Sequence, residues 1–313
     1  MKVAVFDIGT KALKLIIGDT FPNIGDPLDF SLYQNLGKLT YLGDAVQNGI
    51  IDPKDTIQTI AHIKTLKQEA EVRGVDQFLA VGTAIFRNIK NKEEIISSIK
   101  DMANLDTIKI LTQEEEAKYS MIAALFSSGG SLKKNEICML IDQGGGSTEI
   151  GFAKYLGKNN FEIQHSESIN FGSLDFKEKV SSSPKSLKKA FDDVALQVKD
   201  IVKKHKKFKT NHNIKMFGMG SGITNLTGKK SNKKQHGKEF TCKSLTGIIE
   251  RRNKEKFLTI KEIDPVLFDR YCLKVLTAEF YSGMLKKYKV NSVRVCGAGL
   301  RYGVLFSYLI DHK

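Results

Sequence analysis

The chain has 313 residues, of which 41% are hydrophobic and 27% are charged, and its formal net charge is +14. This hydrophobic content is enough to form a buried core and excludes a disordered chain. The length favours two domains or one large α/β domain. Tyr119–Leu132, the longest stretch without a charged residue, is too short to span a bilayer. Asp7 interrupts the N-terminus before the apolar core of a signal peptide could form, so no such peptide is expected.

The four cysteines have no paired spacing and no histidine at ligand distance, so neither a disulfide framework nor a zinc site is expected. They are Cys138, Cys242, Cys272 and Cys296. We therefore expect free thiols in a reducing cytoplasm.

Most of the net positive charge, +12 of +14, lies between Ser181 and Lys243, a segment with 16 lysines, no arginine and four acids. This segment is either a solvated lysine-rich face or a track for a polyanion. Lysine without arginine or interleaved aromatic residues suits non-specific phosphate contact better than base readout, so nucleic acid is not favoured. His205, His212 and His236 lie in this segment and are expected to be exposed to solvent.

Apolar periodicity predicts an alternating α/β chain without an obvious linker. Strands are expected at Lys2–Phe6, Leu13–Gly18, Gln77–Val81, Ile108–Leu111, Met139–Asp142, Thr148–Phe152 and Val293–Cys296. Helices are expected from about Pro53 to just before Gly74, from Thr112, and over Leu187–Lys203, Pro265–Lys287 and Leu300–Ile310. The first helix would use Ile57, Ile60, Ile63 and Leu66 as its apolar face.

Two segments of the chain share one plan. In Phe6–Thr10 and again in Ile141–Thr148, a strand delivers an aspartate, a glycine turn follows, and hydroxyl residues lead into a second strand. Two copies at this separation indicate duplicated α/β domains that face one another across a cleft.

The second glycine turn has the composition of a phosphate-binding loop. Gly144, Gly145 and Gly146 would let an anion approach the backbone N–H groups, and Ser147 and Thr148 add hydroxyls. Taken alone, the three glycines would more often be an ordinary hairpin turn. Asp142 and Glu149 bracket the turn, however, and carboxylates beside phosphate-binding amides indicate a cation between them, normally Mg²⁺. Asp7, Gly9, Thr10 and Lys11 repeat the arrangement in the first copy, where Lys11 would meet a phosphate as a point charge.

Thr112–Ala117 lies where a strand becomes a helix. Thr112 and Glu115 have the spacing of a capping box, which gives Glu115 a structural role, and Glu114 is a solvated first-turn acid. Glu116 is then the candidate to orient and deprotonate a water molecule that attacks phosphorus.

Three further glycine-containing junctions follow strands. Arg87, after Gly82-Thr83, is placed either to clamp a phosphate or as an ordinary surface arginine. Gly220, Ser221 and Gly222 precede a helix whose N-terminus suits a phosphate. Gly297–Gly303 fits close packing of a strand against a helix better than ligand contact.

Together these motifs resemble the exopolyphosphatase/guanosine-pentaphosphate phosphatase (Ppx/GppA) family, within the superfamily of actin, sugar kinases and Hsp70 ATPases. The resemblance rests on motifs along nearly the whole chain, of which the glycine turn is the most specific. They are Asp7-Ile8-Gly9, Val81-Gly82-Thr83 with Arg87, Glu115-Glu116-Ala117, Asp142 with Gly144–Glu149, Gly172, Gly218–Gly222 and Gly299-Leu300-Arg301 with Gly303. The chain departs from the family at three places: Thr10-Lys11-Ala12 replaces Ser-Asn-Ser, and Cys272 and Tyr302 replace acids.

The resemblance implies two RNase H-like (actin-like ATPase) domains flanking a cleft: residues 1–120, with a C-terminal helix at about 299–313 packing back on them, and the lysine-rich second domain, residues 121–298. It implies hydrolysis of the terminal phosphoanhydride of inorganic polyphosphate or guanosine pentaphosphate with Mg²⁺ and, in many members, a monovalent cation such as K⁺. Homodimers are common in the family. Glu116 matches the catalytic glutamate, Asp142 and Glu149 the metal- and water-organising acids, and Arg87 the phosphate-binding arginine, with Asp7 as a further candidate metal ligand. A polyphosphate- or alarmone-binding protein with little hydrolysis, and a kinase of the same superfamily, are the second and third hypotheses.

Overall fold

The computed structural model describes residues 1–10, 12–24, 26–128, 130–144, 147–169, 171–172, 187–228, 232–250 and 265–312. They form two compact units, Met1–Gly129 with Ala298–Lys313, and Gly130–Gly297. Helix α4 (Gln113–Phe126), within which the sequence analysis put the boundary, lies wholly in the first unit. The C-terminal helix α12 (Leu300–Asp311) packs against α4.

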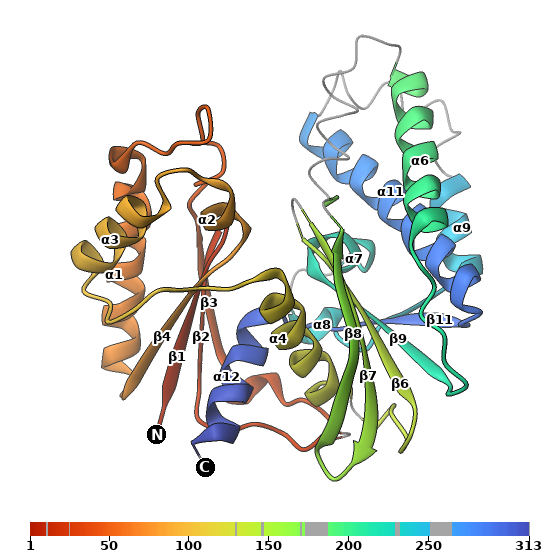
Figure 1. Cartoon of the computed structure of the whole chain (residues 1–313), viewed down its shortest axis with the longest axis horizontal. Helices are drawn as coiled ribbons and strands as arrows, with labels where there is room; N and C mark the ends of the chain where they lie inside the picture. Colours follow the sequence, from red (N-terminus) through yellow and green to blue (C-terminus); the bar gives the residue numbers. More distant parts are fainter. Residues whose placement is uncertain are drawn as a thin grey trace. The chain divides into compact units, whose positions relative to one another are not determined.

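The first unit is built on a mixed sheet in the order β3-β2-β1-β4-β5. Its strands are β1 (Val3–Ile8), β2 (Ala12–Gly18), β3 (Gln34–Leu39), β4 (Gln77–Gly82) and β5 (Lys109–Ile110). Antiparallel pairing joins β1, β2 and β3, whereas β1, β4 and β5 run parallel. Helices α1 (Ile57–Val72) and α3 (Lys92–Ala103) cover one face of this sheet, and α4 and α12 cover the other (Figure 1). Every residue of β1 is therefore buried.

Helix α1 follows a short 3-10 turn, Pro53–Thr56, whose preceding residue Asp52 accepts a hydrogen bond from the backbone N–H of Lys54. Ile60, Ile63 and Leu66 are buried as predicted, but Ile57 is 57% exposed. Since α1 begins only at Ile57, this side chain lies at the end of the helix, outside the core cluster.

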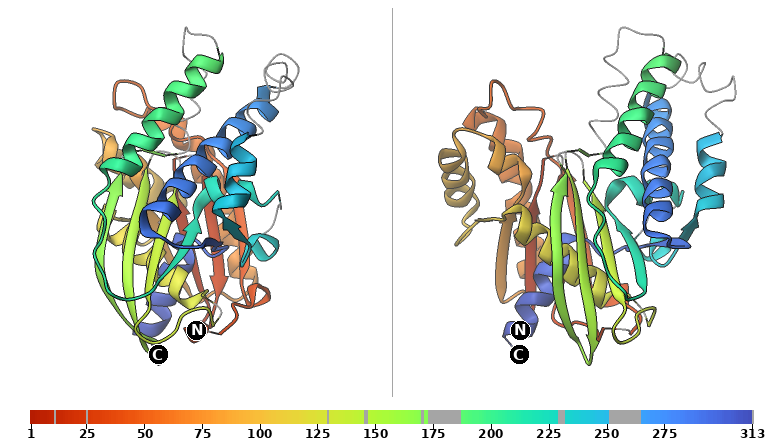
Figure 2. Two further views of the ribbon diagram at one scale, coloured as in Figure 1. Left: turned by 90° about the vertical axis from the view of Figure 1, so that its right-hand side faces the viewer. Right: turned by 45° about the vertical axis from the view of Figure 1, so that its right-hand side comes forward.

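The second unit has a sheet in the order β10-β11-β9-β6-β7-β8. Its strands are β6 (Ile137–Gln143), β7 (Thr148–Gly157), β8 (Asn160–Ile169), β9 (Ile214–Met219), β10 (Glu239–Thr241) and β11 (Ser292–Val295). Its helices are α6 (Leu187–Lys204), α7 (Gly220–Leu226), α8 (Asn232–Gln235), α9 (Cys242–Glu250) and α11 (Pro265–Tyr288). Helices α6 and α11 lie side by side on one face of the sheet, where they bury the apolar side chains of β6 and β7 (Figure 2).

The two sheets repeat one topology. Strands β6, β7, β8, β9 and β11 follow the order and directions of β1, β2, β3, β4 and β5. The turns also agree, because Gly9 N–H donates to Ala12 O (3.1 Å) and Gly144 N–H donates to Ser147 O (2.9 Å). The duplication predicted from the two aspartate–glycine segments is thus confirmed, and with it the α/β fold class.

His205 was expected to be exposed, and this prediction is wrong. It is 7% exposed because it follows the last turn of α6 and inserts between Glu167 on β8 and Tyr288 on α11. His212 is exposed as predicted, and Nδ1 of the partly buried His236 accepts the backbone N–H of Gly297.

The cysteines are free thiols, and burial raises the pKa of Cys138 well above its ordinary value. None of the helices in the described ranges is both long and apolar enough to cross a membrane.

Candidate active site

Asp7 lies near the end of β1, and Gly9 and Thr10 lie in the β1–β2 turn that follows, whereas Lys11 lies outside the described residues. Asp7 is 7% exposed. A Cβ added to Gly9 would lie 3.9 Å from both Asp7 Oδ1 and Thr83 Oγ1, so a carboxylate and a hydroxyl flank this glycine. Thr83 precedes the short helix α2 (Ala84–Asn88), which carries Arg87.

Arg87 on α2 and Glu116 on α4 form an ion pair within the first unit. Arg87 Nη1 lies 2.6 Å from Glu116 Oε2 and also donates to the Leu111 carbonyl at 2.7 Å. Both side chains are largely buried, with 19% and 15% exposure. The structure therefore joins two residues that the sequence analysis assigned to separate roles.

The capping box predicted at the start of α4 is confirmed. Glu115 N–H donates to Thr112 Oγ1 (3.1 Å), and Thr112 N–H donates to Glu115 Oε2 (3.0 Å). Lys109 Nζ lies 2.6 Å from Glu115 Oε1 and lowers the pKa of that carboxyl. Glu114 is exposed. Of the three consecutive glutamates, Glu116 is thus the one that contacts Arg87.

Two cationic residues near Asp7 were not among the sequence candidates. Lys14 lies directly opposite Asp7 in the β1–β2 ladder. Arg301 on α12 donates through Nε and Nη2 to Asn35 Oδ1, at 3.2 and 2.9 Å. Burial lowers the pKa of Arg301, and the charge of Asp7 opposes this shift. Lys14 could have been found from its spacing in the sequence. It follows Asp7 by seven residues, as Glu149 follows Asp142 in the second copy.

In the second unit, Asp142 and Glu149 are directly opposite each other on β6 and β7. Glu149 is 5% exposed and accepts a hydrogen bond from Ser168 Oγ at 3.1 Å. Like charges directly opposite in a ladder repel, and a bound cation would relieve the repulsion. Lys14 occupies the position in the first unit that Glu149 occupies in the second.

The glycine turn itself is described only in part, because Gly145 and Gly146 lie outside the described residues. Ser147 and Thr148 are buried, and Thr148 Oγ1 donates to the Phe171 carbonyl at 2.6 Å. That hydroxyl therefore anchors the start of β7 to the segment after β8.

Gly220 and Gly222 pack the start of α7 onto the end of β6. Gly220 has a φ of +87°, and an added Cβ would lie 2.1 Å from Gln143 O and 2.9 Å from Asp142 Oδ1. At Gly222 the added atom would lie 1.9 Å from Gln143 Oε1. Ser221, between them, is exposed. The junction thus brings backbone against the Asp142 carboxylate, where a larger residue does not fit.

The two departures that replace acids lie in cores. Tyr302 is fully buried, its hydroxyl accepts Asn35 Nδ2 at 2.7 Å, and its ring lies 5.4 Å from that of Tyr33. Cys272 is 1% exposed in the second core. Within the described ranges, no three His, Cys, Asp or Glu side chains come together as a metal site.

The comparisons with known proteins identify the family and the fold of the chain. A sequence model of the Ppx/GppA phosphatase family matches residues 34–312. The crystal structure of the Aquifex aeolicus Ppx/GppA family member is 23% identical with a TM-score of 0.76, and the match covers 100% of this chain and 99% of that one. The type II variant of the Aquifex aeolicus Ppx/GppA phosphatase is 25% identical with a TM-score of 0.69, covering 98% and 99%.

An exopolyphosphatase from Cytophaga hutchinsonii is 17% identical with a TM-score of 0.65, covering 99% of this chain and 98% of its own. A comparison with curated protein sequences found no match. Because the family match spans nearly the whole sequence and the full-length structural matches share the fold, the chain belongs to the Ppx/GppA phosphatase family.

Proposed function

We propose that this phosphatase hydrolyses the terminal phosphoanhydride of inorganic polyphosphate in a Mg²⁺-dependent reaction, with Glu116 as the general base. The observation that carries the proposal is the Arg87–Glu116 ion pair, which holds a largely buried carboxylate in a defined orientation. Guanosine pentaphosphate is the second candidate substrate.

Glu116 would accept a proton from the attacking water. The water oxygen forms the new bond to the terminal phosphorus, the bridging P–O bond breaks, and the shortened chain leaves with the bridging oxygen. Arg87 Nη1 orients Glu116 Oε2, and the other N–H groups of the same guanidinium can bind oxygens of the terminal phosphate. Lys14 and Lys11 would add positive charge in the first unit.

Asp142 and Glu149 are the residues that would hold Mg²⁺, with Asp7 as a further candidate from the first unit. Their donor set fits, because Mg²⁺ is commonly bound by one or two carboxylates together with substrate phosphate oxygens and water. When bound, the ion would offset negative charge on the transferring phosphoryl group. Ser168 fixes the Glu149 carboxylate, and the backbone N–H groups of the glycine turn and of Gly220–Gly222 would bind phosphate oxygens.

The lysine-rich segment favours the polymer. A linear polyphosphate gains from many separate cationic contacts, whereas a nucleotide needs few. We further propose that the protein works in the cytoplasm, with K⁺ as an accessory ion and a homodimer as its assembly.

The test is phosphate release by Glu116→Gln beside Glu114→Gln, with polyphosphate and guanosine pentaphosphate in parallel, in Mg²⁺ and K⁺. Glu114 is a matched control because it lies in the same helical turn but is exposed. We expect Glu116→Gln to lose about 10²-fold or more in turnover with binding retained, and Glu114→Gln to remain active.

Equal activity of the two variants would exclude Glu116 as the base. Thermal stabilisation of the unmodified chain by substrate without any phosphate release would instead support a binding protein on this fold.

A further inference from the structure

The second unit contains a cavity of about 860 Å³ at the end of the sheet where β9 and β11 begin. Ile214 and Ser292, the first residues of those strands, line it. Asp142 and Gly220 lie at the other end, where β6 and β9 finish. The lining continues along β9 to Phe217, so Gly218 and Met219 are the residues of that strand between the cavity wall and Gly220.

The cavity wall is strongly cationic. Lys207, Lys209, Lys215, Lys289 and Arg294 line it. Two carboxylates also line it, and each already accepts a hydrogen bond. Glu136 accepts the backbone N–H of Lys133 at 2.8 Å, and Glu239 accepts the hydroxyl of Ser292 at 3.0 Å. Positive charge therefore exceeds negative charge around the space.

Arg294 carries a donor that the protein does not satisfy. Its Nε is buried and has no hydrogen-bond partner among the described residues. The guanidinium lies against Gly237, where an added Cβ would be 3.4 Å from Nη2 and 3.8 Å from Nε. A buried N–H on a cation costs free energy when it is unpaired, and Arg294 keeps its positive charge at the cavity wall.

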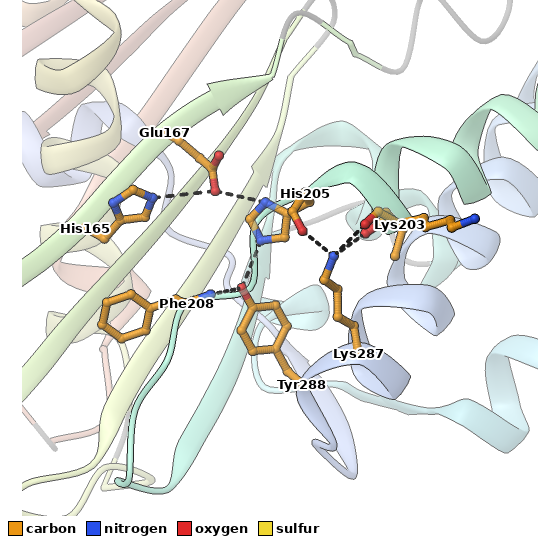
Figure 3. A network of polar contacts seen from close by, with 8 residues as sticks. His165, Glu167, Lys203, His205, Phe208, Lys287 and Tyr288 are labelled. Carbon is orange, nitrogen blue, oxygen red and sulfur yellow. Dashed lines mark hydrogen bonds and ion pairs between the residues drawn. The ribbon is translucent and has the colours of Figure 1, made fainter.

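A polar network fixes the wall beside the lysines (Figure 3). The Tyr288 hydroxyl oxygen accepts the backbone N–H of Phe208 at 3.0 Å and lies 2.9 Å from His205 Nε2. His205 Nδ1 lies 2.9 Å from Glu167 Oε1. This contact is within ion-pair distance but is not a hydrogen bond. Because the Tyr288 hydroxyl oxygen accepts from Phe208, its own proton is available to His205 Nε2. The contacts thus connect the Phe208 backbone, the Tyr288 hydroxyl and the His205 ring, with the Glu167 carboxylate beside the ring.

Lys287 ties the same wall to α6. Its ammonium donates to the carbonyls of Val202, at 2.6 Å, of Lys203 and of His205 (Figure 3). A cation at the carbonyl end of a helix is favourable, because it satisfies free acceptors and opposes the helix dipole. These contacts therefore hold the residues of the wall in place without a bound ligand.

The aromatic residues of the wall are already engaged. Phe208 stacks on Phe152 with ring centroids 4.5 Å apart, and Lys207 Nζ lies 5.8 Å from the Tyr288 ring. Neither ring is open to stack on a nucleobase, which single-stranded nucleic acid binding requires. The lining thus favours an anion without bases.

We propose that this cavity binds a linear chain of phosphate groups, as a second anion site apart from the glycine turn. The cations come from four separate segments, so a chain with a charge on every phosphate meets several of them together. The identity of the ligand rests on the proposed function. If the enzyme acts on a polymer, this site would hold the polyphosphate near the glycine turn and raise the effective concentration of the polymer there.

The experiment uses the full chain with Glu116→Gln, so that ligand is held without turnover, and tripolyphosphate as the probe in calorimetry. Lys209, Lys215 and Lys289 are all exposed, so their replacement by glutamine leaves the fold intact. We expect two binding events before the triple replacement and one after it. In the active chain, the triple replacement should raise KM for long polyphosphate about tenfold, equivalent to about 1.4 kcal/mol, without changing kcat.

The control replaces three exposed lysines of the first unit, Lys38, Lys54 and Lys64, with glutamine, which makes the same change in net charge. Equal loss of tripolyphosphate binding in the control and the cavity variant would overturn the proposal. So would equal binding of polyglutamate, which would make the site one for acidic peptides. Residual hydrolysis by Glu116→Gln would count against the proposed base, whereas loss of one binding event in the triple variant would still support the cavity.

Discussion

Replacing Gly303 with alanine tests how closely α12 must approach α4. An added Cβ would lie 1.7 Å from the Tyr119 carbonyl oxygen and 2.5 Å from its carbon. Both atoms belong to the backbone of α4, so no side-chain rotation relieves the overlap. The helices must separate by roughly 1.5 Å to restore van der Waals contact.

Such a shift loosens the aromatic cluster that α12 brings to the first core. Tyr302 and Phe306 lie 5.4 and 5.7 Å from Tyr33, and Phe306 lies 5.8 Å from Phe126. Overpacking costs about 1–3 kcal/mol, and alanine regains up to about 1 kcal/mol over glycine inside a helix. Because the overlap is with backbone atoms, we take about 3 kcal/mol for the overpacking and expect a net loss of about 2 kcal/mol, or about 4–8 °C in Tm for a unit of this size.

Thermal and urea unfolding followed by circular dichroism measure this effect, with Gly299→Ala as the matched control. Gly299 precedes the same helix at a φ of −114°, and an added Cβ meets no atom within 4 Å. A Gly303→Ala chain as stable as Gly299→Ala would refute the argument from backbone overlap.

Three further changes test other parts of the structure. Thr112→Ala should cost about 1 kcal/mol in urea unfolding through loss of the capping box, whereas Glu114→Ala should cost little; equal effects would contradict this. Burial, opposed by Glu167 and reinforced by Lys287 and His165, lowers the pKa of His205. Because the unfolded chain then binds more protons, the free energy of unfolding should fall as pH drops below about 6.5, by at most about 1.4 kcal/mol per pH unit, and His205→Gln should remove this dependence. Ser168→Ala should raise the Mg²⁺ concentration needed for half-maximal activity about tenfold at unchanged Tm; an unchanged requirement would contradict the role given to Glu149.

The sequence revealed those parts of the fold that repeat or alternate strongly. The two aspartate–glycine turns were recognisable because a hairpin is local, and their hydrogen bonds match in the structure. Strand β8 was not predicted, because Asn160–Ile169 is a largely polar edge strand without an apolar run. Helix α3 could have been found, since Ile95, Ile99 and Ala103 follow helical spacing and are buried.

The candidate site was predictable by residue type but not by partner. Arg87 and Glu116 were both singled out, yet their pairing depends on how α2 and α4 pack after β4 and β5. Ser168 reaches Glu149 only through the register of β7 and β8. His205 appeared to belong to a solvated lysine-rich face, because nothing local indicates that β8 and α11 converge on it.

The return of α12 to the first unit has a consequence for synthesis. Leu305 and Phe306 are fully buried there, so this core cannot be completed until residues 130–297 have left the ribosome. The second unit, although later in the sequence, is therefore the one whose segments are all available first. Throughout that interval the nascent chain carries β1, β2 and α4 with one apolar face uncovered, the kind of surface that chaperones bind.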